Sequence, residues 1–241
     1  MSPHLVLAHG FTQTSRSWDT MRGLLSDRMP DATAVAVDMP GHGDASDRRG
    51  DLWEAADHLV DTGGSGVFIG YSMGGRVALH AAIARPDSVD RLVLIGATAG
   101  IDSERKRALR READEAIAER IERDGVPAFV DWWLQNPLFA GLDEASAQRS
   151  DRCRNTIEGL ASSLRQCGTG TQDPLWDRLG GIDIPTLILV GEHDPKFREL
   201  GERLAASLPQ ASMRTIADAG HSVHLEQPEA TADALVNWLR R

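Results

Sequence analysis

Cysteine is scarce in this sequence of 241 residues, which contains only Cys153 and Cys167. Two cysteines cannot form the disulfide framework of a small secreted protein, and their spacing matches no metal-binding motif. We therefore expect a protein of a reducing compartment, the cytoplasm.

Long apolar runs are also missing. The first residues lack the basic region of a signal peptide, and the apolar run that follows them extends only from Leu5 to Ala8. Such a run is too short for a signal sequence or a membrane span. The sequence therefore predicts no membrane partner.

Positive charge is in deficit, because 26 lysines and arginines face 36 acidic residues and give a formal net charge of −10. This excess of negative charge disfavours nucleic acid and anionic membrane surfaces as partners. An anionic substrate would need a local cluster of arginine or lysine to hold it against the overall field. The composition says nothing of the oligomeric state.

What the sequence does contain is an alternation of short apolar runs with longer amphipathic stretches. Helical patterns such as Gly75–Ala84 and Arg198–Ser207 separate the apolar runs. This alternation predicts an α/β protein with a doubly wound, mostly parallel sheet. The runs are rich in Val, Ile and Leu, as is typical of strands buried on both faces of such a sheet. They are His4–Ala8, Thr33–Val37, Gly66–Ile69, Arg91–Ile95, Pro185–Val190 and Ser212–Ile216.

The segment from about residue 101 to 178 interrupts this alternation. It has helical patterns but no clear strand, and it falls between the fourth and fifth predicted strands. We expect it to form a helical cap or lid, inserted before the last strands of a single domain that spans residues 1–241. A closing helix is expected over Pro228–Arg241.

A candidate nucleophile follows the third predicted strand. Gly70-Tyr71-Ser72-Met73-Gly74 has the pattern G-x-S-x-G and lies between an apolar strand and a helical pattern. In a nucleophile elbow, a sharp and strained turn exposes the serine hydroxyl above the carboxyl ends of the strands. An ordinary glycine-rich turn is the alternative, but the strand–turn–helix context favours a catalytic Ser72.

A serine hydroxyl needs a neighbouring base and a group that orients that base. His221 follows the last predicted strand after Gly220, and we favour it over His224. Asp194 follows the fifth strand and fits the role of orienting acid better than Glu192. Taken alone, these residues could be a surface histidine and a turn cap. The order Ser, Asp, His is that of enzymes with a nucleophile elbow, so we predict a triad.

The first predicted strand ends in His9-Gly10-Phe11. In enzymes with this elbow, the loop after that strand donates one backbone N–H to the developing oxyanion, and the residue after the nucleophile donates another. We therefore expect the backbone N–H groups of Phe11 and Met73 to form an oxyanion hole.

Together these motifs are similar to those of the 2-succinyl-6-hydroxy-2,4-cyclohexadiene-1-carboxylate synthases of menaquinone (vitamin K2) biosynthesis. This family belongs to the α/β-hydrolase superfamily, and the resemblance runs over nearly the whole chain. The elbow and the Gly-His pair are shared by the whole superfamily, whereas the other motifs are more specific. The matching segments are His9–Phe11, Gly70–Arg76, Trp133 with Pro137–Phe139, Gly168–Gln172 with Trp176, Gly191–Phe197 and Gly220-His221.

The resemblance implies an α/β-hydrolase fold and a lyase activity. Enzymes of this family eliminate pyruvate from 2-succinyl-5-enolpyruvyl-6-hydroxy-3-cyclohexene-1-carboxylate and use no metal or organic cofactor. The resemblance also implies that Ser72, relayed by His221, removes a ring proton instead of forming an acyl-enzyme. The partner is then a small anionic substrate with several carboxylates.

The resemblance further implies that Tyr71, Arg76, Arg110, Trp133 and Arg152 bind the substrate. Arginine suits this role because its planar guanidinium can bind a carboxylate through two hydrogen bonds. The predicted lid opens with a basic run, which contains Arg105, Lys106, Arg107, Arg110 and Arg111. For this run, the alternative is a solvated charged helix face with ion pairs such as Arg111–Glu115. For Trp133, the alternative is a core position.

Two other functions remain open. A carboxylic-ester or thioester hydrolase would use the same triad through an acyl-enzyme. Arg76 and the segment Gly168–Gln172 argue against it, because a neutral ester needs neither. A non-enzymatic binding protein of the same fold is the second alternative, and an intact triad gives it no support.

Overall fold

The computed structural model describes residues 2–241 and contains one sheet of six strands in the order β2-β1-β3-β4-β5-β6. All neighbouring strands are parallel, so the predicted α/β fold with a parallel sheet is confirmed. All six predicted strands are present, with ends that differ by at most two residues. The strands are β1 (His4–Ala8), β2 (Thr33–Val37), β3 (Gly66–Tyr71), β4 (Val89–Ile95), β5 (Thr186–Gly191) and β6 (Ala211–Ile216).

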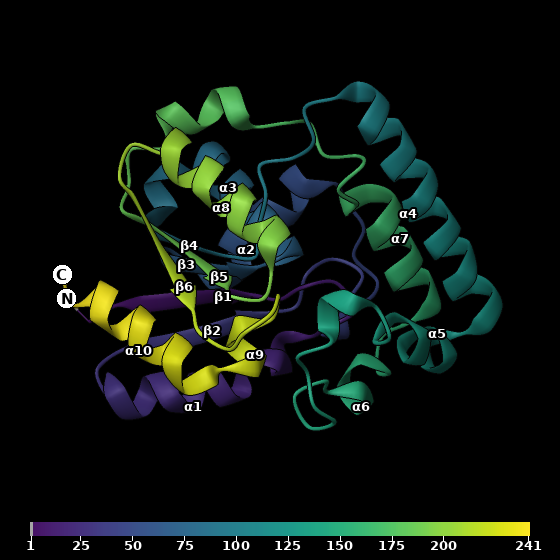
Figure 1. Cartoon of the computed structure of the whole chain (residues 1–241), viewed down its shortest axis with the longest axis horizontal. Helices are drawn as coiled ribbons and strands as arrows, with labels where there is room; N and C mark the ends of the chain where they lie inside the picture. Colours follow the sequence, from purple (N-terminus) through teal and green to yellow (C-terminus); the bar gives the residue numbers. More distant parts are fainter. Residues whose placement is uncertain (1) are drawn as a thin grey trace.

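Helices cover both faces of the sheet (Figure 1). One face carries α1 (Asp19–Arg28) and α10 (Pro228–Leu239), and the other carries α2 (Leu52–Gly63), α3 (Met73–Ala84) and α8 (Pro195–Ser207). Because successive side chains of a strand point to opposite faces of the sheet, they pack into two separate apolar cores, one on each face. The closing helix α10 begins where it was predicted and ends at Leu239.

A helical cap lies between β4 and β5, as predicted, and covers one end of the sheet (Figure 1). It consists of α4 (Glu104–Asp124), α5 (Val126–Trp133), α6 (Arg149–Arg152) and α7 (Ile157–Cys167). The cap has a small core of its own, in which residues such as Phe129 are fully buried. The remaining helical elements are the short helix α9 (Val223–Glu226) and 3-10 turns at Ser15–Trp18, Gly43–Ala45, Pro86–Ser88, Pro137–Phe139 and Trp176–Gly181.

Within residues 2–241, every helix is too short or too polar to cross a membrane. The longest, α4, has 21 residues, but charged side chains occur throughout it.

The turn between β3 and α3 depends on glycine. Ser72 has φ +51° and ψ −106°, a conformation that L-residues rarely adopt. A Cβ atom on Gly74 would overlap the carbonyl oxygens of Ala8 and His9, because the first turn of α3 approaches the end of β1 closely. Only a residue without a side chain can therefore occupy this position.

We predict that Gly74→Ala lowers the free energy of unfolding by at least about 2 kcal/mol, because the new methyl group meets backbone that cannot move aside. Gly23→Ala is the matched control, since a Cβ atom there meets nothing within 4 Å on the exposed side of α1. It should raise the stability by about 0.5–1 kcal/mol. Urea unfolding of both variants checks this, and equal effects of the two changes would contradict it.

Candidate active site

The structure brings the three predicted triad side chains together. His221 Nε2 lies 3.3 Å from Ser72 Oγ, and His221 Nδ1 lies 2.8 Å from Asp194 Oδ2. Ser72 follows β3, Asp194 follows β5 and His221 follows β6, so all three lie at the carboxyl ends of parallel strands. His221 and Asp194 are buried, which shields their hydrogen bond from water.

Asp194 is held in place by the start of α8. Its Oδ1 accepts a hydrogen bond from the backbone N–H of Phe197 at 3.2 Å, which leaves Oδ2 for His221. The Phe197 ring packs on the His221 ring with centroids 4.3 Å apart. Gly96 has φ +54°, and a Cβ atom there would lie within 3.0 Å of the His221 ring, so glycine makes room for that ring.

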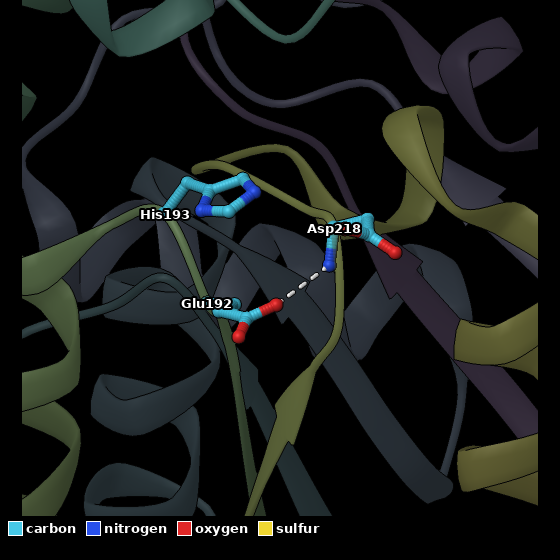
Figure 2. Close-up of side chains that lie close together, drawn as sticks. All are labelled: Glu192, His193 and Asp218. Carbon is cyan, nitrogen blue, oxygen red and sulfur yellow. Dashed lines mark hydrogen bonds between the residues drawn. The ribbon is translucent and has the colours of Figure 1, made fainter.

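The competing residues lie elsewhere. Glu192 accepts a hydrogen bond of 3.0 Å from the backbone N–H of Asp218 (Figure 2). His224 is fully buried, and its ring stacks on Trp18 with centroids 4.6 Å apart. Burial lowers the pKa of His224 to about 3. Neither Glu192 nor His224 reaches Ser72 within residues 2–241, so the geometry favours Asp194 and His221.

The loop after β1 places the expected oxyanion donors. Phe11 and Met73 both line the cavity beside Ser72, and within residues 2–241 neither backbone N–H has a hydrogen-bond partner. Two buried histidines hold this loop: His9 Nε2 accepts from the backbone N–H of Met39 at 3.0 Å, and His42 Nε2 accepts from that of Thr12 at 3.3 Å. Sequence reasoning gave His42 no role.

A cavity of about 130 Å³ lies above Ser72, between the sheet and the cap. His221 lines it with Ser72. The cavity is also lined by all the residues that were expected to form the oxyanion hole or to bind the substrate. They are Phe11, Tyr71, Met73, Arg76, Arg110, Trp133 and Arg152. The structure therefore gathers these residues, which come from the loop after β1, from β3, from α3 and from the cap, around one space.

Two arginines of this cavity are buried without an acidic partner. Arg76 is 7% exposed and Arg152 is 1% exposed, and within residues 2–241 neither has a carboxylate oxygen within 4.0 Å. Nη1 of Arg76 and Nη2 of Arg152 have no hydrogen-bond partner there either. Burial lowers the pKa of each guanidinium to about 10. Burying an unpaired charge is unfavourable, so the site is built to receive negative charge.

The third cavity arginine differs. Arg110 donates from Nε to Asp114 at 2.7 Å, one turn further along α4, and is more exposed. The pair Arg111–Glu115 suggested by the helical spacing does not form. Glu115 instead binds Arg165 of α7 at 2.6 Å, and Arg111 donates to the carbonyl oxygen of Gly170 at 2.9 Å.

Two of the aromatic residues that line the cavity, Trp133 and Tyr71, have mixed roles. Trp133 lines the cavity and also packs in the cap, with its ring centroid 5.8 Å from that of Phe129. Its buried indole N–H has no partner within residues 2–241. The hydroxyl of Tyr71 lies 2.6 Å from Ser222 Oγ, and its ring lies against His221. Tyr71 therefore presents mainly its ring to the cavity.

One trio of side chains in the described part of the chain has the spacing of metal ligands. The ligand atoms of Glu192, His193 and Asp218 lie within 4.8 Å of one another (Figure 2). All three side chains are exposed, and none of them lines the cavity above Ser72. We assign this trio no function.

Comparison with known proteins agrees with this geometry, since the sequence model of the alpha/beta hydrolase family matches residues 5–234. The chain belongs to the alpha/beta hydrolase family. It is 36% identical to a putative 2-succinyl-6-hydroxy-2,4-cyclohexadiene-1-carboxylate synthase of Bacillus subtilis, over 94% of this chain and 86% of that protein. It is 35% identical to the synthase of Citrobacter koseri, over 99% and 94% of the two chains. Within the alpha/beta hydrolases, the chain thus belongs to this synthase family, which confirms the resemblance.

Solved structures are similar over the whole chain. The structure of MenH from S. aureus superposes with a TM-score of 0.90 at 31% identity and covers 99% of this chain and 93% of its own. A thermophilic esterase from Thermogutta terrifontis superposes with a TM-score of 0.82 at 27% identity and covers 100% and 90%. This alpha/beta hydrolase architecture is thus common to a synthase and an esterase.

We predict that Asp194→Asn slows the reaction of Ser72 with diisopropyl fluorophosphate by at least about 100-fold, because an amide disturbs the tautomer and orientation of His221. Asp218→Asn is the control, since Asp218 is an exposed residue of the loop between β6 and His221. Its φ of +54° is a conformation that asparagine tolerates. The rate is followed by the mass of the modified protein. A damaging Asp218 change beside a harmless Asp194 change would refute the assignment of the acid.

Proposed function

We propose that this chain is a 2-succinyl-6-hydroxy-2,4-cyclohexadiene-1-carboxylate synthase and eliminates pyruvate from 2-succinyl-5-enolpyruvyl-6-hydroxy-3-cyclohexene-1-carboxylate. The observation that carries the proposal is the pair of buried guanidinium groups, Arg76 and Arg152, beside the serine of a hydrogen-bonded triad. The names of the curated relatives support the same activity.

The substrate carries three carboxylates, on the ring, on the succinyl group and on the enolpyruvyl group. Arg76, Arg110 and Arg152 approach the cavity from α3 and from the cap, so they can bind carboxylates at different points of the ligand. The cap acts as a lid that belongs to the same domain as the sheet. In a protein with a net charge of −10, such local cations are needed to hold an anion.

The reaction starts with removal of a proton from the ring carbon that bears the succinyl group. Ser72 Oγ takes this proton and passes its own to His221, and Asp194 stabilises the resulting imidazolium. The succinyl carbonyl next to that carbon becomes an enolate, whose oxygen accepts hydrogen bonds from the N–H groups of Phe11 and Met73.

The electrons of the enolate then form a ring double bond. The existing double bond shifts by one position, and the bond from the ring to the enolpyruvyl oxygen breaks. Enolpyruvate leaves with the electron pair and takes up the proton that His221 holds, which yields pyruvate and restores the neutral imidazole. The ring, which began with one double bond, ends with two conjugated ones, no water is consumed and no covalent bond to Ser72 forms.

Ester hydrolysis is the competing activity, because the esterase at 27% identity shares this architecture. An esterase uses the serine as a nucleophile and needs no cation for a neutral substrate. The two unpaired arginines therefore favour the synthase.

We predict that the protein releases pyruvate from this substrate and barely cleaves p-nitrophenyl acetate. Ser72→Ala should lower pyruvate release by about 10³-fold or more without loss of stability, because the hydroxyl faces the cavity and contributes little packing. Oxidation of NADH by added lactate dehydrogenase reports pyruvate. Efficient ester cleavage with no pyruvate formed would establish the hydrolase instead.

We predict that Arg76→Ala lowers kcat/KM for pyruvate release by about 10- to 150-fold, the value of one charge-assisted hydrogen bond of about 1.5–3 kcal/mol. Arg76→Lys should recover part of this, since an ammonium keeps the charge but not the planar fork. The control is Arg85→Ala at the other end of α3, where the guanidinium pairs with exposed Asp57 and Asp61. If Arg76→Ala lowered the melting temperature but left kcat/KM within about twofold, the arginine would be structural.

A further inference from the structure

Glu226 holds the loop that carries His221. Its Oε2 accepts a hydrogen bond from the backbone N–H of Gly220 at 2.6 Å, and its Oε1 accepts one from the backbone N–H of Ser222 at 2.8 Å. Gly220 and Ser222 are the two neighbours of His221 in the sequence. One carboxylate thus fixes the peptide groups on both sides of the histidine.

This loop needs such a support. It lies between the end of β6 and the start of α9, so no sheet ladder fixes its backbone at His221. The ring of His221 has to meet Ser72 on one side and Asp194 on the other, and small displacements of the backbone would lengthen both hydrogen bonds. Placement errors of about 1 Å can lower a rate by about 100-fold.

The cap contacts the same carboxylate from the other side. A Cβ atom on Gly141, in the cap segment after Pro137–Phe139, would overlap Oε2 of Glu226. Pro137, Leu138 and Gly141 line one wall of a second cavity, and Glu226 lines it together with His221. Glu226 therefore lies where the cap segment meets the histidine loop.

We propose that Glu226 is a positioning residue that sets His221 at its working distance from Ser72, and that the cap segment at Gly141 keeps the Glu226 carboxylate in place. A carboxylate suits this role because it offers an acceptor oxygen to each N–H group, whereas an amide offers one oxygen and one N–H₂ donor. In Glu226→Gln, one backbone N–H faces a donor, and that side of the loop must move. The use of pyruvate release as a readout rests on the function proposed above.

The first test compares Glu226→Gln with Glu229→Gln, a control on α10 whose exposed carboxylate pairs with Arg28. Glu226→Gln should lower kcat for pyruvate release by about 10- to 100-fold and leave KM within about twofold, since the arginines of the cavity are untouched. The control should match the unmodified protein. Gly141→Ala displaces the same carboxylate from the cap side and should lower kcat in the same way, by a smaller factor.

The second test uses diisopropyl fluorophosphate, which needs no knowledge of the substrate. Ser72 Oγ attacks phosphorus, fluoride leaves and His221 takes the hydroxyl proton, so the rate reports the placement of His221. Glu226→Gln should slow this modification by a factor similar to its loss of kcat. If the unmodified protein forms no pyruvate but Glu226→Gln still slows the labelling of Ser72, the proposed function fails and the positioning role stands.

The proposal is overturned if folded Glu226→Gln labels Ser72 at the unmodified rate, or if it raises KM while kcat stays unchanged. Circular dichroism and thermal melting establish that the variant is folded. If Glu226→Gln does not fold, Gly141→Ala decides, because it leaves Glu226 and both backbone donors in the chain. A folded Gly141→Ala protein with unchanged labelling and unchanged kcat would then exclude the coupling to the cap and with it the proposal.

Discussion

The left-handed turn at Ser72 is the constraint on which the site depends. Because Ser72 has φ +51°, the chain reverses within one residue from β3 into α3. The same turn points the hydroxyl to the cavity, frees the N–H of Met73 at the start of the helix and brings Arg76 to the cavity wall one turn later. Three groups with different tasks thus take their positions from a single backbone conformation, which the neighbouring glycines permit.

The electrostatics of the site oppose the stability of the free protein. Arg76 and Arg152 lose most of their hydration on folding, and within residues 2–241 they gain no carboxylate in return. Such an arrangement lowers the stability of the free protein. Binding of an anion would relieve this penalty and so contribute to the free energy of binding. The remaining arginines of the cap mostly pair with acids on the surface, as Arg165 does with Glu115 and Glu122, and they stabilise the cap itself.

Local signals in the sequence were sufficient to predict the sheet and to select three side chains that the structure brings together. Strands buried on both faces read as apolar runs, and Ser72, Asp194 and His221 each follow such a run in the order known for this fold. Glu226 could not be assigned in this way, because its role comes from backbone donors on an irregular loop. In the sequence, Glu226 is simply a glutamate five residues after His221. This spacing predicts no contact, because the contact depends on the conformation of the loop. The partner of Glu115 was equally hidden, since a contact between α4 and α7 prevailed over the spacing within one helix.

The cap is built around a core that is largely separate from the two cores of the sheet. A substitution in the core of the cap, such as one at Phe129, therefore alters the cap side of the cavity while the elbow and the strands keep their packing. Changes in the cap can therefore alter which molecules fit the cavity while the sheet keeps its own packing. The same Ser, His and Asp can therefore work under caps of different sequence, and a cap can be exchanged for another without loss of a stable sheet.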